Sequence, residues 1–253
     1  MKDCSPGIAP IVKGDKFSLN QCPQNDLERE QMRNIPYASA IRSLMYAQVC
    51  TRRNIGFAFR MFGRYQSNPS LEHWKTAKKV MRYLRGTKEY RLTYKHSDFL
   101  EAIGYSELDF VGCVDIRMST SGYIYLFAGR AVAWRSAKQT SVASSTMEAE
   151  YIAVFEASAH ANWLRNFIKY LKIVASIARP LKIYSDNMAI VYFAKNNKNG
   201  SHKKHIDIKY LVVRRHVRNG EISIEHISTQ QMIAYPITKG LLANLYKSHV
   251  ENH

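Results

Sequence analysis

The order of strand-like and helix-like segments after about residue 100 constrains the fold more than any other feature. Three short runs rich in Tyr, Ile, Val and Phe predict an antiparallel meander, at 102–109, 121–128 and 131–136. Helices and further strands are expected after them, at 145–171, 181–185, 187 onward, 205–218 and 222–227. Strands in a run, followed by strands alternating with helices, predict an α/β (α+β) domain with helices packed on a mixed sheet.

The first hundred residues have a different pattern. Residues 1 to about 35 are polar and interrupted by prolines, so an extended lead-in is expected there. Helices are predicted from Pro36 onward and over 71–85. In the second of these helices an apolar stripe is expected to face the core: Trp74, Ala77, Met81 and Leu84. We therefore divide the chain into 1–98, a lead-in with a helical segment, and 99–253, the mixed-sheet domain.

The chain is strongly basic. Its 253 residues include 37 Lys and Arg against 20 Asp and Glu, a formal net charge of +17 that suits a polyanion such as nucleic acid. The stretch 195–218 alone holds eight basic residues and one acid, and these eight are candidate nucleic-acid contacts: Lys195, Lys198, Lys203, Lys204, Lys209, Arg214, Arg215 and Arg218. A solvated helix face is the alternative reading.

Cysteine usage and hydropathy favour an intracellular protein. The four cysteines lie far apart without CxxC pairs, which predicts reduced thiols rather than a zinc site or a disulfide framework. The sequence has no apolar run near the roughly 18 residues that a membrane span needs, and no secretory signal at its start. We expect no membrane contact and a place in the cytoplasm or nucleus.

Acidic residues stand at the ends of the predicted elements. Glu107 and Asp109 lie near the end of the first strand, Glu150 in the first turns of the long helix, and Asp186 at the exit of the fourth strand. Strand ends and helix starts on one side of a sheet can converge, and gathered carboxylates with a substrate phosphate are what Mg²⁺ prefers. The alternative is four separate surface charges.

Several segments together resemble the copia-type retrotransposon Pol polyprotein, in its C-terminal RNase H region. They are Gly104-Tyr105-Ser106-Glu107-Leu108-Asp109, Ser119-Thr120-Ser121-Gly122-Tyr123, Ser145-Thr146-Met147-Glu148-Ala149-Glu150-Tyr151, Tyr184-Ser185-Asp186-Asn187 and Lys204-His205-Ile206-Asp207. Upstream, Pro36-Tyr37-Ala38-Ser39 and Arg82-Tyr83-Leu84-Arg85-Gly86-Thr87 resemble the segment that connects reverse transcriptase to RNase H. The resemblance implies an RNase H-like fold that cleaves the RNA strand of an RNA–DNA hybrid with Mg²⁺ held by four carboxylates.

Two of those four carboxylates are replaced in this chain. Glu150 and Asp186 match the family, but Glu107 and Tyr235 stand where the family has Asp. Glu107 adds a methylene, which moves the carboxylate by more than the ~0.5 Å that preorganised sites tolerate, and a neutral phenol is a poor ligand for a hard cation. Asp109, on the same strand face as Glu107, is a weaker substitute. We expect a degenerate site, poor Mg²⁺ binding and a domain that retains binding to RNA–DNA hybrid or duplex; an active RNase H is an alternative.

The tetrapeptide Arg82-Tyr83-Leu84-Arg85 suggests a different function. It spells the Arg-x-Leu-Arg motif of secreted effectors of plant-pathogenic oomycetes, and some proteins described as such effectors resemble copia Pol fragments. The resulting alternative is a virulence protein secreted into a plant cell, where it reaches the nucleus or another compartment and suppresses defence through a host protein. Because the motif lies in a predicted helix, inheritance from the retroelement explains it as well.

Overall fold

The computed structural model describes residues 4–15, 17–97, 100–113, 115–172, 180–195 and 204–251. The chain forms two compact units, one from Met1–Leu92, Cys113–Ile116 and Lys239–His253 and the other from Thr93–Gly112 and Arg117–Thr238. The C-terminal segment from Lys239 therefore packs within the first unit. The division expected between residues 98 and 99 falls outside the described residues and stays a prediction.

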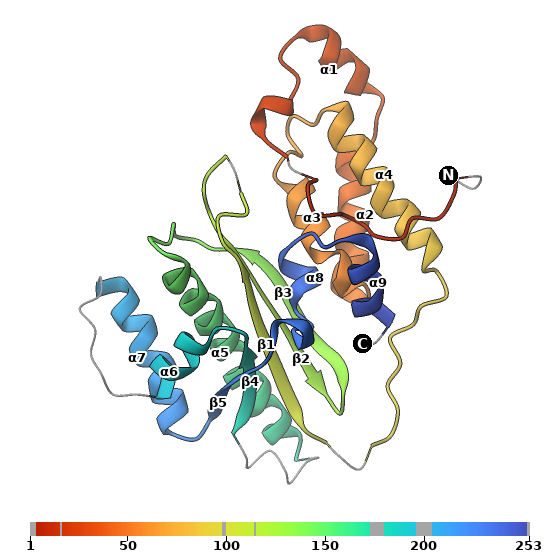
Figure 1. Cartoon of the computed structure of the whole chain (residues 1–253). Helices are drawn as coiled ribbons and strands as arrows, with labels where there is room; N and C mark the ends of the chain where they lie inside the picture. Colours follow the sequence, from red (N-terminus) through yellow and green to blue (C-terminus); the bar gives the residue numbers. More distant parts are fainter. Residues whose placement is uncertain are drawn as a thin grey trace. The chain divides into compact units, whose positions relative to one another are not determined.

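The second unit is built on a five-stranded mixed sheet in the order β3-β2-β1-β4-β5 (Figure 1). The strands are β1 (Ala102–Asp109), β2 (Thr120–Phe127), β3 (Arg130–Lys138), β4 (Leu181–Ser185) and β5 (Ile222–His226). The pairs β1–β2 and β2–β3 are antiparallel, whereas β1–β4 and β4–β5 are parallel. The predicted fold class is confirmed: an RNase H-like mixed sheet with flanking helices.

Helices cover both faces of this sheet. The helices of the second unit are α5 (Thr146–Leu171), α6 (Met188–Lys195), α7 (Lys204–Arg218) and the short α8 (Tyr235–Thr238). Tyr123 of β2 packs in the cluster with α5, and its neighbour Gly122 faces Ile237 and Thr238 of α8. Because adjacent strand residues point to opposite faces, α5 and α8 lie on opposite sides of the sheet.

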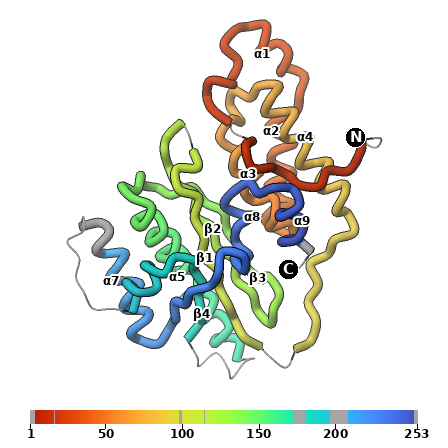
Figure 2. The backbone as a smooth tube through the Cα atoms, in the orientation of Figure 1, coloured from red at the N-terminus to blue at the C-terminus, as the bar shows by residue number. Residues whose placement is uncertain are grey.

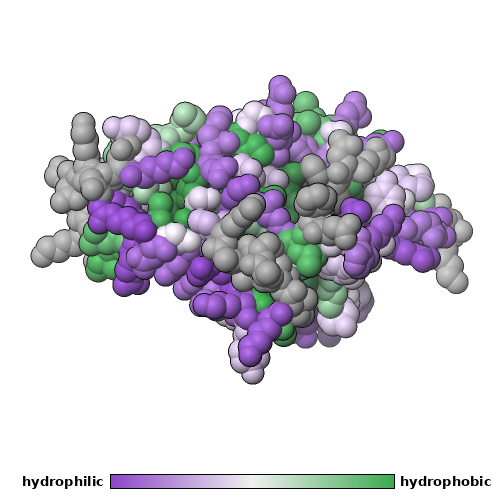
Figure 3. Space-filling view, turned by 90° about the horizontal axis from the view of Figure 1, so that it is seen from below, coloured by the Kyte–Doolittle hydropathy of each residue, from purple (hydrophilic) through white to green (hydrophobic). Residues whose placement is uncertain are grey.

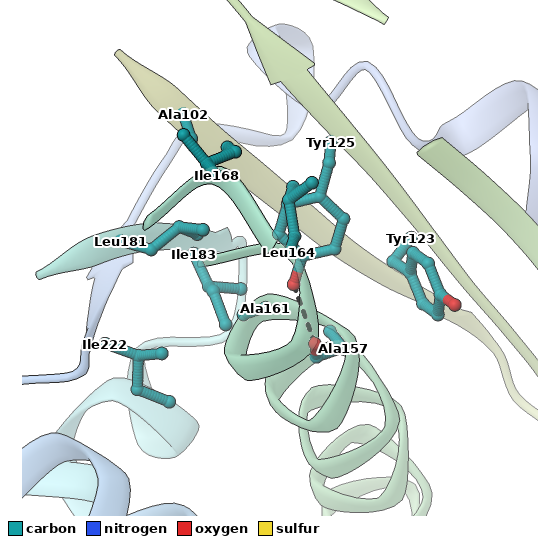
Figure 4. Close-up of a cluster of buried hydrophobic side chains, with 10 residues drawn as sticks. All are labelled: Ala102, Tyr123, Tyr125, Ala157, Ala161, Leu164, Ile168, Leu181, Ile183 and Ile222. Atoms are coloured by element: carbon teal, nitrogen blue, oxygen red, sulfur yellow. Dashed lines mark hydrogen bonds between the residues drawn. The ribbon is translucent and has the colours of Figure 1, made fainter. Parts of the chain in front are cut away.

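The face toward α5 holds an apolar core (Figure 4). Its buried side chains come from four strands and the helix: Ala102, Tyr123, Tyr125, Ala157, Ala161, Leu164, Ile168, Leu181, Ile183 and Ile222. The Tyr125 hydroxyl donates to the Ala157 carbonyl at 2.7 Å, which satisfies the polar group that this cluster buries. Ser145 caps α5 as expected, accepting from the Glu148 amide, but the Glu148 carboxylate reaches the Ser144 amide instead of closing the box on Ser145.

The first unit is helical. It contains α1 (Asp26–Arg33), α2 (Tyr37–Cys50), α3 (Gly56–Gly63), α4 (Leu71–Gly86) and α9 (Ala243–Glu251), with the 3₁₀ turns η1 (Leu19–Gln21) and η2 (Arg53–Ile55). The expected extended lead-in was wrong for α1, which Asn25 caps by accepting from the Glu28 amide at 2.9 Å. Residues before η1 run alongside α4, where the Gly7 amide donates to the Arg82 carbonyl at 3.0 Å (Figure 2).

The apolar stripe predicted for α4 was partly wrong. The buried residues are His73, Thr76, Ala77, Val80 and Tyr83, while Trp74, Met81 and Leu84 are half-buried. Large apolar side chains were taken as the core, but the polar ones find partners inside it. The His73 ring stacks on Tyr65 at 4.3 Å and its Nδ1 bonds the Ser70 cap, so burial lowers the pKa of His73 to about 4 and keeps it neutral.

The surface is mixed. The face shown in Figure 3 is mainly hydrophilic, with separate hydrophobic patches between the polar side chains. Among the helices that the structure describes, none carries an apolar stretch long enough to cross a bilayer.

Candidate functional site

The sheet brings Glu107 and Asp186 to one edge. β1 and β4 are parallel neighbours in which Tyr105 pairs with Tyr184. Two residues further along each strand come Glu107, which is 2% exposed, and Asp186, which is half-buried directly after β4. The expected convergence of these two acids follows from this register.

Tyr235 joins the same site. Its hydroxyl donates to Asp186 Oδ2 at 2.9 Å, and the Thr229 hydroxyl donates to the same oxygen at 3.2 Å. Burial raises the pKa of the Tyr235 phenol well above its usual range; a hydrogen bond with the Thr229 side chain lowers it, and the nearby carboxylates of Glu107 and Asp186 raise it. Tyr235 is therefore protonated at neutral pH and acts as a hydrogen-bond donor.

Gly122 allows α8 to carry Tyr235 to this position. Gly122 pairs with Glu107 across β1 and β2. A Cβ at Gly122 would lie 2.5 Å from Thr238 Cγ2 and 3.0 Å from Ile237 Cγ1, which is closer than real Cβ contacts allow. A side chain here would push α8 away from the sheet. The position of Tyr235 therefore depends on glycine at residue 122.

The other two acids come from the start of α5 and the end of β1. Glu150 lies half-buried in the first turns of α5, as predicted. Asp109 ends β1 and folds toward the following turn, since a Cβ at Gly112 would lie 2.0 Å from its Oδ2. Its carboxylate therefore lies against Gly112 of this turn, and its substitution for a lost ligand stays a prediction.

The residues present do not fit the Mg²⁺ site that the family resemblance implies. Asp186 Oδ2, an oxygen that a cation would need, already accepts two hydroxyl protons. The side chain in the fourth position is a buried, neutral phenol. Within the described ranges, no group of three or more His, Cys, Asp and Glu side chains is arranged to hold a metal ion.

The sequence did not reveal the residues whose role in the site depends on contacts in the folded chain. Thr229, from the 3₁₀ turn η4 (Thr229–Gln231), carried no signal that it would donate to Asp186. Gly122 stood inside a recognised sequence block, which was the available clue to a close approach at that strand. The hydroxyl of Tyr235 was expected to be a poor ligand, and its role as a donor to Asp186 depends on tertiary packing.

The predicted basic patch is only partly exposed. Lys195, Arg215 and Arg218 are exposed, and Lys209 is half-buried with its ammonium 5.7 Å from the Phe155 ring centre. Arg214 is not a surface contact: it is 5% exposed and its guanidinium lies over the Tyr210 ring at 5.2 Å. Lys198 and Lys203 lie outside the described residues, as does the side chain of Lys204.

The effector-like tetrapeptide lies in α4. Tyr83 is buried, Leu84 is half-buried, and both arginines contact the N-terminal segment. Arg82 Nε donates to the Ser5 carbonyl at 2.8 Å, and Arg85 donates to the Cys4 carbonyl. The motif therefore lies in a packed helix of the first unit and not in an exposed extended segment.

The fold and the acids at the strand ends define an RNase H-like domain. The chain is 36% identical over 247 residues to the Retrovirus-related Pol polyprotein from transposon TNT 1-94 of Nicotiana tabacum, covering 98% of this chain and 18% of the relative. It is 32% identical over 248 residues to the polyprotein from transposon RE1 of Arabidopsis thaliana, covering 98% and 16%. The chain belongs to the copia-type retrotransposon Pol family, as its C-terminal RNase H region with the preceding connection segment.

One relative bears the name of an effector. The chain is 41% identical over 133 residues to Secreted RxLR effector protein 161 of Plasmopara viticola, covering 53% of this chain and 94% of the relative. It spans less than a fifth of the polyproteins' length. No family model matches the chain.

Similar solved structures include two nucleic-acid complexes. LC11-RNase H1 in complex with RNA/DNA hybrid has a TM-score of 0.41 and 14% identity, covering 57% of this chain and 98% of that one. The foamy viral protease-reverse transcriptase in complex with RNA/DNA hybrid has a TM-score of 0.44 and 12% identity, covering 81% and 27%.

Proposed function

We propose that this chain is a catalytically impaired RNase H-like domain that binds nucleic acid without cleaving it. The observation that carries the proposal is the hydrogen bond from Tyr235 to Asp186, which uses a carboxylate oxygen that catalysis would need for a cation. A two-metal site stabilises the attacking and leaving oxygens only when both ions are held in place. With Glu107 lengthened and Tyr235 neutral, that stabilisation is lost.

Nucleic-acid binding rests on charge and does not need the metal site. The chain carries a net charge of +17, and exposed cations stand at Lys195, Arg215 and Arg218. Cations that replace the counterions of a phosphate backbone give affinity that is independent of sequence. RNA–DNA hybrid or duplex is the expected partner class, by membership of the Pol family.

Cleavage of a labelled RNA–DNA hybrid with Mg²⁺ or Mn²⁺ tests the catalytic half of the proposal. The unaltered chain should cleave barely or not at all, whereas the Glu107→Asp, Tyr235→Asp double variant should gain activity that Asp186→Asn then removes. Robust cleavage by the unaltered chain, abolished by Asp186→Asn, would show an active RNase H instead.

Fluorescence anisotropy with the same hybrid tests the binding half. Changing Lys195, Arg215 and Arg218 to Ala should weaken binding and flatten the dependence of log K on log salt by up to about 3. The matched control changes Arg29, Arg33 and Lys88 to Ala, three exposed cations that each pair with an acid. Equal losses in both triple variants would mean that affinity follows net charge alone and is not located at the 195–218 stretch.

A second candidate function is that of a secreted effector that suppresses host defence or cell death through a host protein. The observation that favours it is the similarity to nearly the whole of the Plasmopara viticola effector. Expression of the chain inside plant cells, with a cell-death readout, tests the activity directly. If suppression occurs, the Arg82→Ala, Arg85→Ala variant should retain it, because these arginines bond the chain's own N-terminal segment. Lost suppression in a variant that accumulates and melts like the parent would make the tetrapeptide a working element.

A further inference from the structure

We propose that Tyr235 and Thr229 form a permanent hydrogen-bonded latch on Asp186, which replaces a divalent cation and holds the segment after β5 against the end of β4. Two hydroxyl donors, 43 and 49 residues away in the sequence, converge on one carboxylate oxygen. The inference rests on the same Tyr235–Asp186 bond as the catalytic half of the proposed function, and it adds how this edge of the sheet is held closed. Nucleic acid is not involved in it.

The latch supplies hydrogen-bond donors to one of the two carboxylates at this edge. Asp186 is half-buried, and Glu107 lies close enough to influence the same phenol electrostatically. Two carboxylates near each other need a cation or hydrogen-bond donors. Both bonds go to a charged carboxylate: the partly buried one from Tyr235 is 2.9 Å long, and the exposed one from Thr229 is 3.2 Å long, so Tyr235 contributes the larger share.

The latch also excludes a competing ion. A cation on Asp186 Oδ2 would compete with the Tyr235 hydroxyl for that oxygen, and the ring that carries this hydroxyl is only 8% exposed. That ring is fixed because α8 packs on Gly122, where Ile237 and Thr238 leave no room for a side chain. Tyr235 is therefore a positioning residue: its hydroxyl holds the segment after β5 at the end of β4 without a divalent ion.

Hydrogen exchange of the full-length chain, read at peptides covering 229–238, provides the test. Tyr235→Phe removes the donor and keeps the ring, so exchange there should rise about tenfold, as expected for a hydrogen bond to a charged group. Asp186→Asn keeps an acceptor oxygen and should raise exchange less than Asp186→Ala. Tyr125→Phe is the matched control, since it removes a buried tyrosine hydroxyl bond on the other face; any rise in exchange that it causes should be shared across the sheet and not concentrated at 229–238.

The same exchange measurement with millimolar Mg²⁺ separates a latch from a metal site. Mg²⁺ should leave the unaltered chain and Tyr235→Phe unchanged, and should slow exchange at 229–238 in Tyr235→Asp, where an oxygen ligand replaces the donor. Slowing by Mg²⁺ in the unaltered chain, lost in Asp186→Asn, would overturn the proposal. So would unchanged exchange in Tyr235→Phe. If the unaltered chain does not bind the hybrid, the binding half of the proposed function is wrong, but the proposed latch is unaffected.

Discussion

The two faces of the sheet obey different rules. Toward α5, buried apolar side chains from four strands pack on small helix residues, and the Tyr125 hydroxyl is satisfied by a backbone carbonyl. Toward α8, the sheet buries Glu107 and Thr120 and meets a short helix whose Tyr235 bonds a carboxylate. Burial of apolar side chains stabilises the α5 face, whereas the α8 face depends on specific contacts between individual polar residues. A single replacement can therefore change the chemistry of the α8 face while the fold persists.

The largest effect is expected on the α5 face. Ile183 is fully buried among the cluster residues, so Ile183→Ala should reduce the free energy of unfolding by about 2–5 kcal/mol through lost burial and a residual cavity. Urea denaturation followed by circular dichroism measures the change. A loss below about 1 kcal/mol would contradict a tightly packed α5 face.

An intermediate effect is expected at Gly122. Gly122→Ala forces α8 to shift, because the new Cβ would meet Thr238 Cγ2 at 2.5 Å, and overpacking of this kind costs about 1–3 kcal/mol. The loss should appear in hydrogen exchange mainly at 229–238, with peptides from α5 nearly unchanged. Uniformly faster exchange in both places would show that the two faces are not separable.

A smaller effect is expected when the α5 face loses its buried hydroxyl. Tyr125→Phe leaves the ring in place and removes the donor to the Ala157 carbonyl, so the free energy of unfolding should fall by about 0.5–1.5 kcal/mol. Thermal melts with and without Mg²⁺ should show the same decrease. A decrease that Mg²⁺ reverses would be inconsistent with a purely structural hydroxyl.

The smallest effect is expected outside both faces. Leu211 in α7 is 58% exposed, and Leu211→Ala should change the free energy of unfolding by no more than about 0.5 kcal/mol. The variant serves as the large-to-small control for Ile183→Ala. A loss as large as that of Ile183→Ala would mean that α7 buries this side chain against another surface.

Strong local patterns made most of the sheet predictable. The ranges 102–109 and 181–185 were expected as strands and are β1 and β4, because alternating apolar residues bounded by turn residues fix both register and length. Glu107 and Asp186 were also placed at strand ends, and parallel pairing of β1 with β4 brings those ends together. Periodicity was sufficient wherever a long element buried one face.

Tertiary contact decided the rest. α1 follows prolines that predicted an extended chain, but the Asn25 cap was overlooked. The apolar stripe predicted for α4 was partly wrong because His73 and Tyr83 are buried against Phe17 and Tyr246, two rings that lie far away in the sequence. The four residues of α8 are too few for periodicity, and the bond from Tyr235 to Asp186 depends on close packing at Gly122.

Titration of the unaltered full-length chain with Mn²⁺, followed by electron paramagnetic resonance of the free ion, tests the central claim most directly. If Tyr235 holds Asp186 in place of a cation, the chain should show no saturable Mn²⁺ site that disappears in Asp186→Asn. Tyr235→Asp should create such a site. One or two saturable Mn²⁺ ions on the unaltered chain, lost in both Asp186→Asn and Glu150→Gln, would contradict the account and restore a two-metal nuclease.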